Sequence, residues 1–235
     1  MDMKKIITCA ALLAGIVFFN GRLNAQVESD IVGYTTITME AGKWYQVGCP
    51  FVALDDTAST QKINEVFTIG FSEGDSINIL NTAAMEYVAY YWKTSANGWC
   101  TKRGTTPVDV TINVGQAVFI QKAVAGDVTL SGKVEVAQAT QFGSTTGNAW
   151  NQIVCVYPQD MNLNDMKWDG VADGDVINIL DNTGATPVYN GYYWKTSAKG
   201  WCTKRGTTPV DVKIPAGQAL FVNKASAGIG SVSAQ

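Results

Sequence analysis

The sequence contains no histidine among its 235 residues. Histidine is the side chain whose unperturbed pKa lies near neutrality, and it supplies the base of Ser-His-Asp and Cys-His systems and a ligand of most zinc sites. Its absence excludes conventional hydrolases of those types and any imidazole-based pH switch. We therefore expect a protein that is not an enzyme and that carries no cofactor.

Charge is also scarce, because Asp, Glu, Lys and Arg make up 16% of the chain and the net charge is -3. Such a chain has no basic surface that could neutralise phosphates, which excludes nucleic acid as a partner. A hydrophobic fraction of 46% over this length is sufficient for one large or two small cored domains and excludes intrinsic disorder.

The first 25 residues have the pattern of a secretory signal peptide. Lys4 and Lys5 precede an apolar run over residues 6–19, and Ala25 is a small residue suited to signal peptidase, so the mature chain is expected to start at Gln26. The alternative of an uncleaved anchor needs about 20 apolar residues, and this run is shorter. No second apolar stretch of that length follows, so we expect a secreted protein without stable membrane insertion.

An internal repeat of roughly 100 residues spans nearly the whole mature chain. Residues 92–110 and 194–212 are identical at 18 of 19 positions, and only Asn97 differs, becoming Lys199. Further matches flank this block, namely GDSINIL with GDVINIL, GQAVFIQKA with GQALFVNKA and WYQVGC with WNQIVC. The repeat predicts a signal peptide over 1–25, one β unit over 26–136 and a second over 137–235.

The local pattern within each copy is that of β-strands. Aromatic and β-branched residues over 88–94 precede a turn at 95–98, which predicts a hairpin closed by a left-handed glycine at Gly98 and at Gly200. A helical turn is expected over 60–67, with a counterpart over 163–168. Short strands joined by Gly, Asn, Asp and Thr turns predict an all-β fold of two tandem β-sandwich-like or partly open barrel repeats, and one intertwined sandwich is the alternative.

Four cysteines occupy equivalent positions in the two copies: Cys49, Cys100, Cys155 and Cys202. Since an exported chain favours oxidation, we expect disulfides, and the favoured pairing joins Cys49 to Cys100 and Cys155 to Cys202. The other two pairings also respect the repeat, and four buried free thiols are the remaining alternative.

The order WYQVGCPF, INEVF, GDSINIL, an aromatic hairpin, GQAVFIQKA and DVTLSGKV resembles the β-rich modules of secreted bacterial surface proteins. Copies of those modules commonly contain W-N-L-I-x-x-P, V-F, G-D-x-I and G-x-G-[FY]-[FW]-[IV], and the resemblance covers each repeat almost end to end. Gln116 and Gln218 depart from it where a second glycine would stand. The resemblance implies an extracellular or cell-surface location on a bacterium and an assembly or scaffold role.

Paired carboxylates are the remaining acid-base option, and Asp75, Asp109, Asp175 and Asp211 recur in both copies. Their positions at strand edges and turns favour bonds to backbone amides over glycoside hydrolysis. Asp173 and Asp175, with Asp169, form a weak candidate for calcium.

The aromatic hairpins are a sharper candidate, because tyrosine and tryptophan rings can stack on sugars while cations bond to the hydroxyls. The alternative is that the rings fill the core or cover a protein interface. The residues of this glycan or interface candidate are Tyr91, Trp92, Trp99, Lys102, Arg103, Tyr193, Trp194, Trp201, Lys204 and Arg205.

The second repeat ends soon after GQALFVNKA, which predicts an incomplete final strand and an open sheet edge. We hypothesise that the amino-terminal stretch of another protomer pairs with this edge and builds a head-to-tail filament. The candidate donor residues are Val27, Ile31, Val32, Tyr34 and Ile37.

Together these observations predict a secreted structural component of a cell surface or an extracellular assembly. Its expected partners are further copies of itself or other surface proteins. A lectin-like module that binds polysaccharide through the aromatic hairpins is the alternative.

Overall fold

A computed structural model describes residues 32–52, 60–81, 84, 86–134 and 139–234. Val32–Gln235 form one compact unit. The predicted signal peptide, Val27, Ile31 and the predicted repeat boundary at 136/137 lie outside the described residues. Among the residues that the structure describes, no helix has the length and hydropathy to span a membrane.

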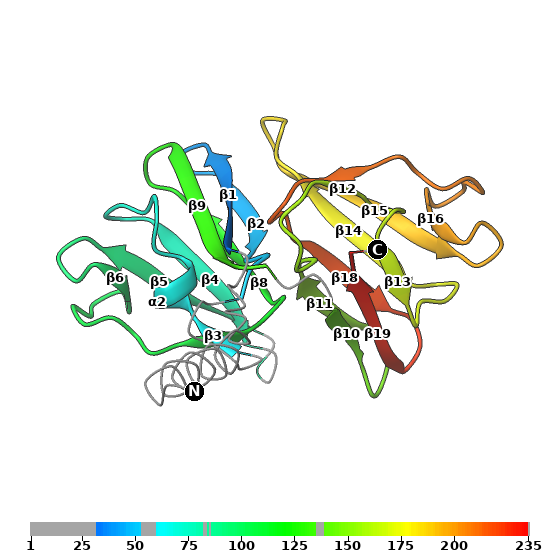
Figure 1. The fold of residues 1–235 in the computed structure, drawn as a ribbon, viewed down its shortest axis with the longest axis horizontal. Coiled ribbons are helices and arrows are strands. Elements are labelled where there is room, and N and C mark those ends of the chain that lie inside the picture. Colours follow the sequence, from blue (N-terminus) through cyan, green and yellow to red (C-terminus); the bar gives the residue numbers. More distant parts are fainter. Residues whose placement is uncertain (1–31, 53–59, 82–83, 85, 135–138, 235) are drawn as a thin grey trace, which may run out of the picture. The chain divides into compact units, whose positions relative to one another are not determined.

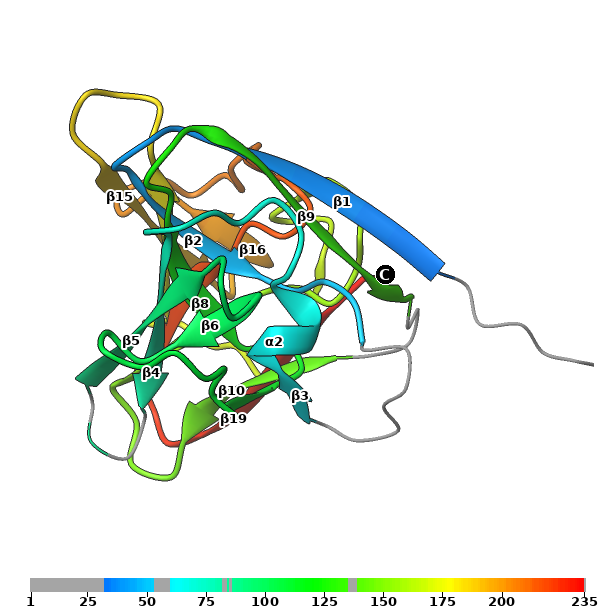
Figure 2. The ribbon, with the colours of Figure 1, turned by 90° about the vertical axis from the view of Figure 1, so that its left-hand side faces the viewer.

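The first repeat is built on a five-stranded antiparallel sheet (Figure 1). Its strand order is β2 (Trp44–Gly48), β8 (Ala117–Gln121), β4 (Ser76–Asn81), β5 (Glu86–Lys93) and β6 (Gly98–Cys100). Two smaller antiparallel pairs accompany it, β1 (Val32–Met39) with β9 (Gly126–Lys133) and β3 (Thr60–Lys62) with β7 (Thr111–Asn113). The short helix α2 (Ile63–Val66) follows β3 directly and lies beside β6 (Figure 2).

The second repeat has the same design. Its five-stranded sheet has the order β11 (Ala149–Ile153), β18 (Leu220–Lys224), β14 (Val176–Asp181), β15 (Val188–Lys195) and β16 (Gly200–Cys202). A three-stranded sheet contains β10 (Thr140–Ser144), β19 (Gly228–Ser233) and β13 (Lys167–Asp169), and β12 (Met161–Asn162) pairs with β17 (Lys213–Ile214). The all-β, sandwich-like prediction is confirmed.

Each repeat encloses its own hydrophobic core. Side chains alternate between the faces of a strand, so Val118 and Ile120 of β8 enter the first core while Phe119 lies on the opposite face of the sheet. Leu220 and Val222 of β18 do the same in the second core. Every strand ladder lies within one repeat, and contact between the repeats is left to side chains, loops and isolated bridges.

The predicted hairpin is present in both copies, but its left-handed residue differs from the prediction. Positive φ falls on Asn97 (49°) and Lys199 (52°), whereas neither following glycine has a positive φ. The glycine is needed for space, because a Cβ on Gly98 would lie 2.8 Å from Oδ1 of Asn64. The helical turn over 60–67 is confirmed as α2, while its counterpart over 163–168 is not helical and leads into β13.

The predicted disulfides are wrong, because all four cysteines are free. Cys49 follows β2 and Cys100 ends β6, and these strands form opposite edges of the same sheet. Four strand spacings separate them by roughly 19 Å, whereas bridged cysteines need Cα atoms within about 7 Å. In the second repeat Cys155 follows β11 and Cys202 ends β16, and these strands are likewise the opposite edges of one five-stranded sheet. Burial raises the pKa of the Cys49 thiol to about 12 and that of Cys155 to about 11.

The predicted open edge in the second repeat is also wrong. The final strand is present as β19, which pairs with β10 on one side and β13 on the other. The candidate donor residues Val32, Tyr34 and Ile37 lie in β1, which pairs along its full length with β9 of its own repeat. Within the described residues, the hypothesised exchange therefore meets a final strand that is already paired on both sides and a strand β1 that is already paired with β9.

Candidate functional site

The predicted aromatic hairpins do not form a surface platform. Trp99 and Trp201 are fully buried and Trp92 is 4% exposed, so three of the four tryptophans belong to the cores. Trp92 packs edge-on against Trp99 with ring centroids 5.4 Å apart, and Trp194 against Trp201 at 5.3 Å. Tyr91 and Tyr193 are half-buried, and of these candidate residues only the Lys102–Arg103 and Lys204–Arg205 pairs are exposed.

Two of the recurring aspartates form buried ion pairs. Asp75 and Lys122 are 0% and 3% exposed in side chain, and Asp175 and Lys224 are 1% and 5% exposed. Asp75 also accepts hydrogen bonds from the backbone amides of Ser72 (2.8 Å) and Ala123 (2.7 Å). These carboxylates are fully engaged in holding one end of each sheet, and they are inaccessible to a substrate.

The other acidic candidates are separate, exposed groups. Asp109 forms an ion pair with Lys62 at 3.0 Å, and Asp211 accepts a hydrogen bond from Asn162. Asp173 accepts from the backbone amide of Thr196 at 2.7 Å. Within the described ranges, no three acidic or cysteine side chains are grouped to hold a metal ion. The calcium candidate is not supported, since Asp175 is neutralised by an ammonium group instead.

The two repeats meet through equivalent segments that contact each other reciprocally. The amide of Gly48 donates to the carbonyl of Gly217 (3.0 Å), and the amide of Val154 donates to the carbonyl of Gly115 (2.9 Å). Gly48 corresponds to Val154 and Gly115 to Gly217 in the repeat alignment. The junction therefore has the isologous arrangement of a two-fold dimer within one chain.

Six aromatic rings, three equivalent ones from each repeat, form a continuous cluster across this junction. Phe119 and Phe221 have ring centroids 6.1 Å apart, and each contacts two further rings of its own repeat. Tyr87 donates a hydrogen bond to Oε1 of Gln152 at 3.3 Å, and burial raises the pKa of Tyr87 to about 12. The members of this junction aromatic cluster are Trp44, Tyr87, Phe119, Trp150, Tyr189 and Phe221.

A cavity of about 490 Å³ lies at the junction and is lined by both repeats. Ile37 and Tyr45 contribute from the first repeat, and Leu180, Tyr192 and Val212 from the second. Polar side chains stand among these apolar ones, namely Glu40, Gln46, Asp181, Asn182, Thr183, Asn190, Lys213 and Gln218.

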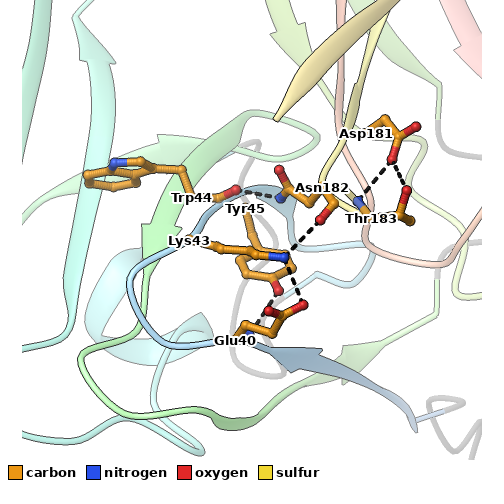
Figure 3. A network of polar contacts seen from close by, with 7 residues as sticks. All are labelled: Glu40, Lys43, Trp44, Tyr45, Asp181, Asn182 and Thr183. Carbon is orange, nitrogen blue, oxygen red and sulfur yellow. Dashed lines mark hydrogen bonds and ion pairs between the residues drawn. The ribbon is translucent and has the colours of Figure 1, made fainter. Parts of the chain in front are cut away.

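A network of polar contacts fixes the rim of the cavity (Figure 3). Lys43 donates to Glu40 at 2.9 Å and, across the junction, to the carbonyl of Asn182 at 3.2 Å. The side-chain amide of Asn182 donates to the carbonyl of Trp44. Figure 3 shows these groups converging from the turn before β2 and the turn after β14, so the two repeats are bonded at this rim.

Several polar groups of the cavity are oriented yet have bonding capacity left. Asp181 accepts from the amide (2.9 Å) and hydroxyl (2.7 Å) of Thr183, which hold the pKa of its carboxyl below its ordinary value. The Tyr45 hydroxyl accepts from the amide of Glu40 at 2.8 Å, so its own proton is available. Both amide atoms of Gln46, a residue only 4% exposed, and Oδ1 of Asn182 have no hydrogen-bond partner in the described chain. Buried polar atoms of this kind are normally satisfied by water or a ligand.

The equivalent hollow on the other side of the junction is smaller, about 140 Å³, and is lined by Leu80, Gln116 and Trp150 among others. In the repeat alignment Asn81 is equivalent to Asp181 of the larger cavity, and Asn151 is equivalent to Tyr45. The larger cavity was not predicted from the sequence. The only signal was that the two repeats differ at these otherwise matching positions.

The fold and the site define an all-β protein of two fused repeats with a ligand-sized cavity at their junction. The chain matches no protein-family model, no curated protein and no solved structure. The resemblance to bacterial surface modules therefore stays a prediction.

Proposed function

We propose that the protein is an exported, non-catalytic binding module that holds a saccharide in the cavity between its repeats. The main observation in favour of this proposal is the cavity itself, whose volume of about 490 Å³ falls within the range of about 300–1,000 Å³ typical of small-molecule sites. Both repeats contribute residues to its lining, as is common for ligand sites between two domains.

The chemistry of the lining favours a sugar over an apolar ligand. Tyr45 and Tyr192 present ring surface, and Asp181, Asn182 and Asn190 present acceptors and donors for hydroxyl groups.

The same residues argue against catalysis. A glycosidase needs a carboxylic acid whose pKa is raised so that it can protonate the leaving group. The Thr183 bonds instead lower the pKa of Asp181, and Glu40 is paired with Lys43. A carboxylate whose pKa is lowered stays ionised at neutral pH, which suits binding.

Replacing Asp181 by Asn is expected to weaken saccharide binding about 10-fold or more, because a hydrogen bond to a charged group contributes about 1.5–3 kcal/mol. Asparagine keeps an acceptor for Thr183, so the fold is retained. Affinity is measured by calorimetry with oligosaccharides selected on a glycan array. The matched control is Asp127→Asn on β9, whose carboxylate bonds Thr38 outside the cavity.

The pH dependence of binding has a defined sign. The pKa of Asp181 in the folded protein lies below the ordinary value of 3.8. Saccharide affinity is therefore retained as the pH falls to about 3.8, and it is lost only at lower pH, where the carboxylate becomes protonated. If the array yields no ligand, or if Asp181→Asn and Asp127→Asn bind alike, the cavity is not the binding site.

Self-association is the second candidate, and the exposed strand β1 favours it. Tyr34 and Val32 are 77% and 58% exposed, and within the described ranges no strand pairs with the edge of β1 opposite β9. An unprotected edge with apolar side chains is a template for another chain. This interface would join β1 to a second copy directly, without the strand exchange that the sequence suggested.

The double substitution Val32→Lys/Tyr34→Lys is expected to convert assemblies of the protein into monomers, since lysines on an edge strand oppose pairing. Light scattering over a concentration series measures the mass. Ile229→Lys on β19, a residue that is 58% exposed on a strand paired on both sides, is the control and should leave the mass unchanged. A wild-type protein that stays monomeric at every concentration contradicts this candidate.

A further inference from the structure

The two copies of the duplicated block, residues 92–110 and 194–212, share a surface that the fold does not require. Thr101, Lys102, Arg103, Thr105 and Thr106 are exposed, and each is repeated unchanged in the second copy. Meanwhile buried positions have changed between the repeats, for example Val47 to Ile153 and Val118 to Leu220. Surface substitutions away from special features cost about 0.5 kcal/mol or less, so stability does not explain this identity.

The block also contains every cationic group without a partner in the described chain. Outside it, each described lysine forms an ion pair or another interaction. Inside it, Lys93 is paired with Glu73 at 3.4 Å. The unpartnered cations are Lys102, Arg103, Lys195, Lys199, Lys204 and Arg205. Among the described residues, unpaired positive charge is thus confined to this block and its copy, in a chain whose net charge is -3.

The exposed cations stand on preformed loops. The amide of Gly104 donates to the carbonyl of Thr101 at 3.0 Å, which closes a tight turn around Lys102 and Arg103. Asn64 then ties the loop to the hairpin, since its side chain donates to Val108 (2.7 Å) and accepts from the Trp99 amide (2.7 Å). A rigid display reduces the conformational entropy lost on binding.

The second copy repeats each of these bonds. Gly206 donates to Thr203 at 3.0 Å, and Asn164 donates to Val210 at 2.8 Å and accepts from the Trp201 amide at 2.7 Å. The two loops therefore present the same groups in the same conformation.

We propose that the loops at Lys102–Arg103 and Lys204–Arg205 are two equivalent sites for a carboxylated polysaccharide, which the protein binds bivalently. Arginine matches the planar geometry of a carboxylate, and the adjacent threonine hydroxyls can bond sugar hydroxyls. Two identical sites fit a ligand that itself repeats, because separate stretches of one long polymer can occupy both. These sites are distinct from the junction cavity and do not depend on its proposed role.

Alginate, a polyuronate, is the probe, and neutral dextran is the reference polymer. At low ionic strength, where the screening length exceeds about 10 Å, immobilised alginate should retain the wild type and dextran should not. Lys102→Gln/Arg103→Gln and Lys204→Gln/Arg205→Gln should each weaken retention by about 10–100-fold and to the same extent, because each removes one of two linked contacts. The fourfold variant should lose binding. Asp181→Asn should leave it unchanged, which separates this proposal from the saccharide cavity.

The matched control is Lys167→Gln, which removes an exposed charge that is already paired with a carboxylate outside the cavity. It should change retention by less than about 3-fold, as expected for weak surface pairs. Retention of the wild type equally on dextran, an equal loss in this control, or a loss confined to one loop would overturn the proposal. Equal affinity for poly-glutamate would also overturn it, since the sites would then select charge alone.

Discussion

Replacing Lys122 by methionine is expected to lower the free energy of unfolding by about 3–5 kcal/mol. Asp75 is 0% exposed, and without the ammonium group its carboxylate would be a buried charge whose partners are two backbone amides and the Ser72 hydroxyl. Lys122 also donates to the carbonyl of Gly70, which would lose its partner. Urea unfolding followed by circular dichroism measures the change.

The cost comes from the charge left behind, so removing both charges should recover most of it. The double variant Asp75→Asn/Lys122→Met is expected to be clearly more stable than Lys122→Met alone. Lys93→Met breaks an ion pair in which Glu73 is 58% exposed and should cost at most about 1 kcal/mol. Lys224→Met should match Lys122→Met, because the second repeat contains the same pair. A cost for Lys122→Met no larger than that for Lys93→Met would refute the argument.

Gly48→Val is expected to destabilise the protein by about 1–3 kcal/mol and to open the junction. A side chain at Gly48 would overlap Cβ and Cγ1 of Val154, its equivalent in the other repeat. Thermal unfolding measures the loss, and saccharide affinity reports on the cavity that the junction encloses.

Exchanging the two residues offers a rescue. The variant Gly48→Val/Val154→Gly places valine at position 48 and glycine at position 154, so the contact is restored with its sides reversed. We expect a favourable coupling free energy within the range of about 0.5–3 kcal/mol found for contacting residues. Gly126→Val is the control, since a Cβ there would meet no atom within 4 Å. Independent, additive effects of the two substitutions would show that they do not meet.

The repeat and the all-β fold followed from the sequence because duplication and alternation leave regular patterns. The disulfides did not, because the spacing of Cys49 and Cys100 carries no information about sheet order, and that order places them at opposite edges. In the hairpin, aromatic residues fill consecutive positions, so alternation could not say which rings enter the core. The structure assigns Trp92 and Trp99 there.

The junction was harder to predict because backbone groups and small residues form much of it. The bonds between Gly48 and Gly217 and between Val154 and Gly115 leave no hydrophobic pattern. The sequence also did not determine where each strand begins and ends. The strand β19 was missed because the Gly-Ile-Gly-Ser segment at its start has little strand propensity. One mismatch did point to the junction, since Gly48 aligns with Val154 inside an otherwise similar block.

The meeting of Gly48 with Val154 has a consequence for how such a chain can diverge. In a symmetric pair of separate subunits, any substitution on the axis occurs twice, so a bulky residue there faces its own copy. Covalent linkage removes that constraint, because a larger side chain can evolve in one repeat while a smaller residue in the other repeat provides the space for it. The same freedom lets one of two formerly identical hollows enlarge while its twin closes.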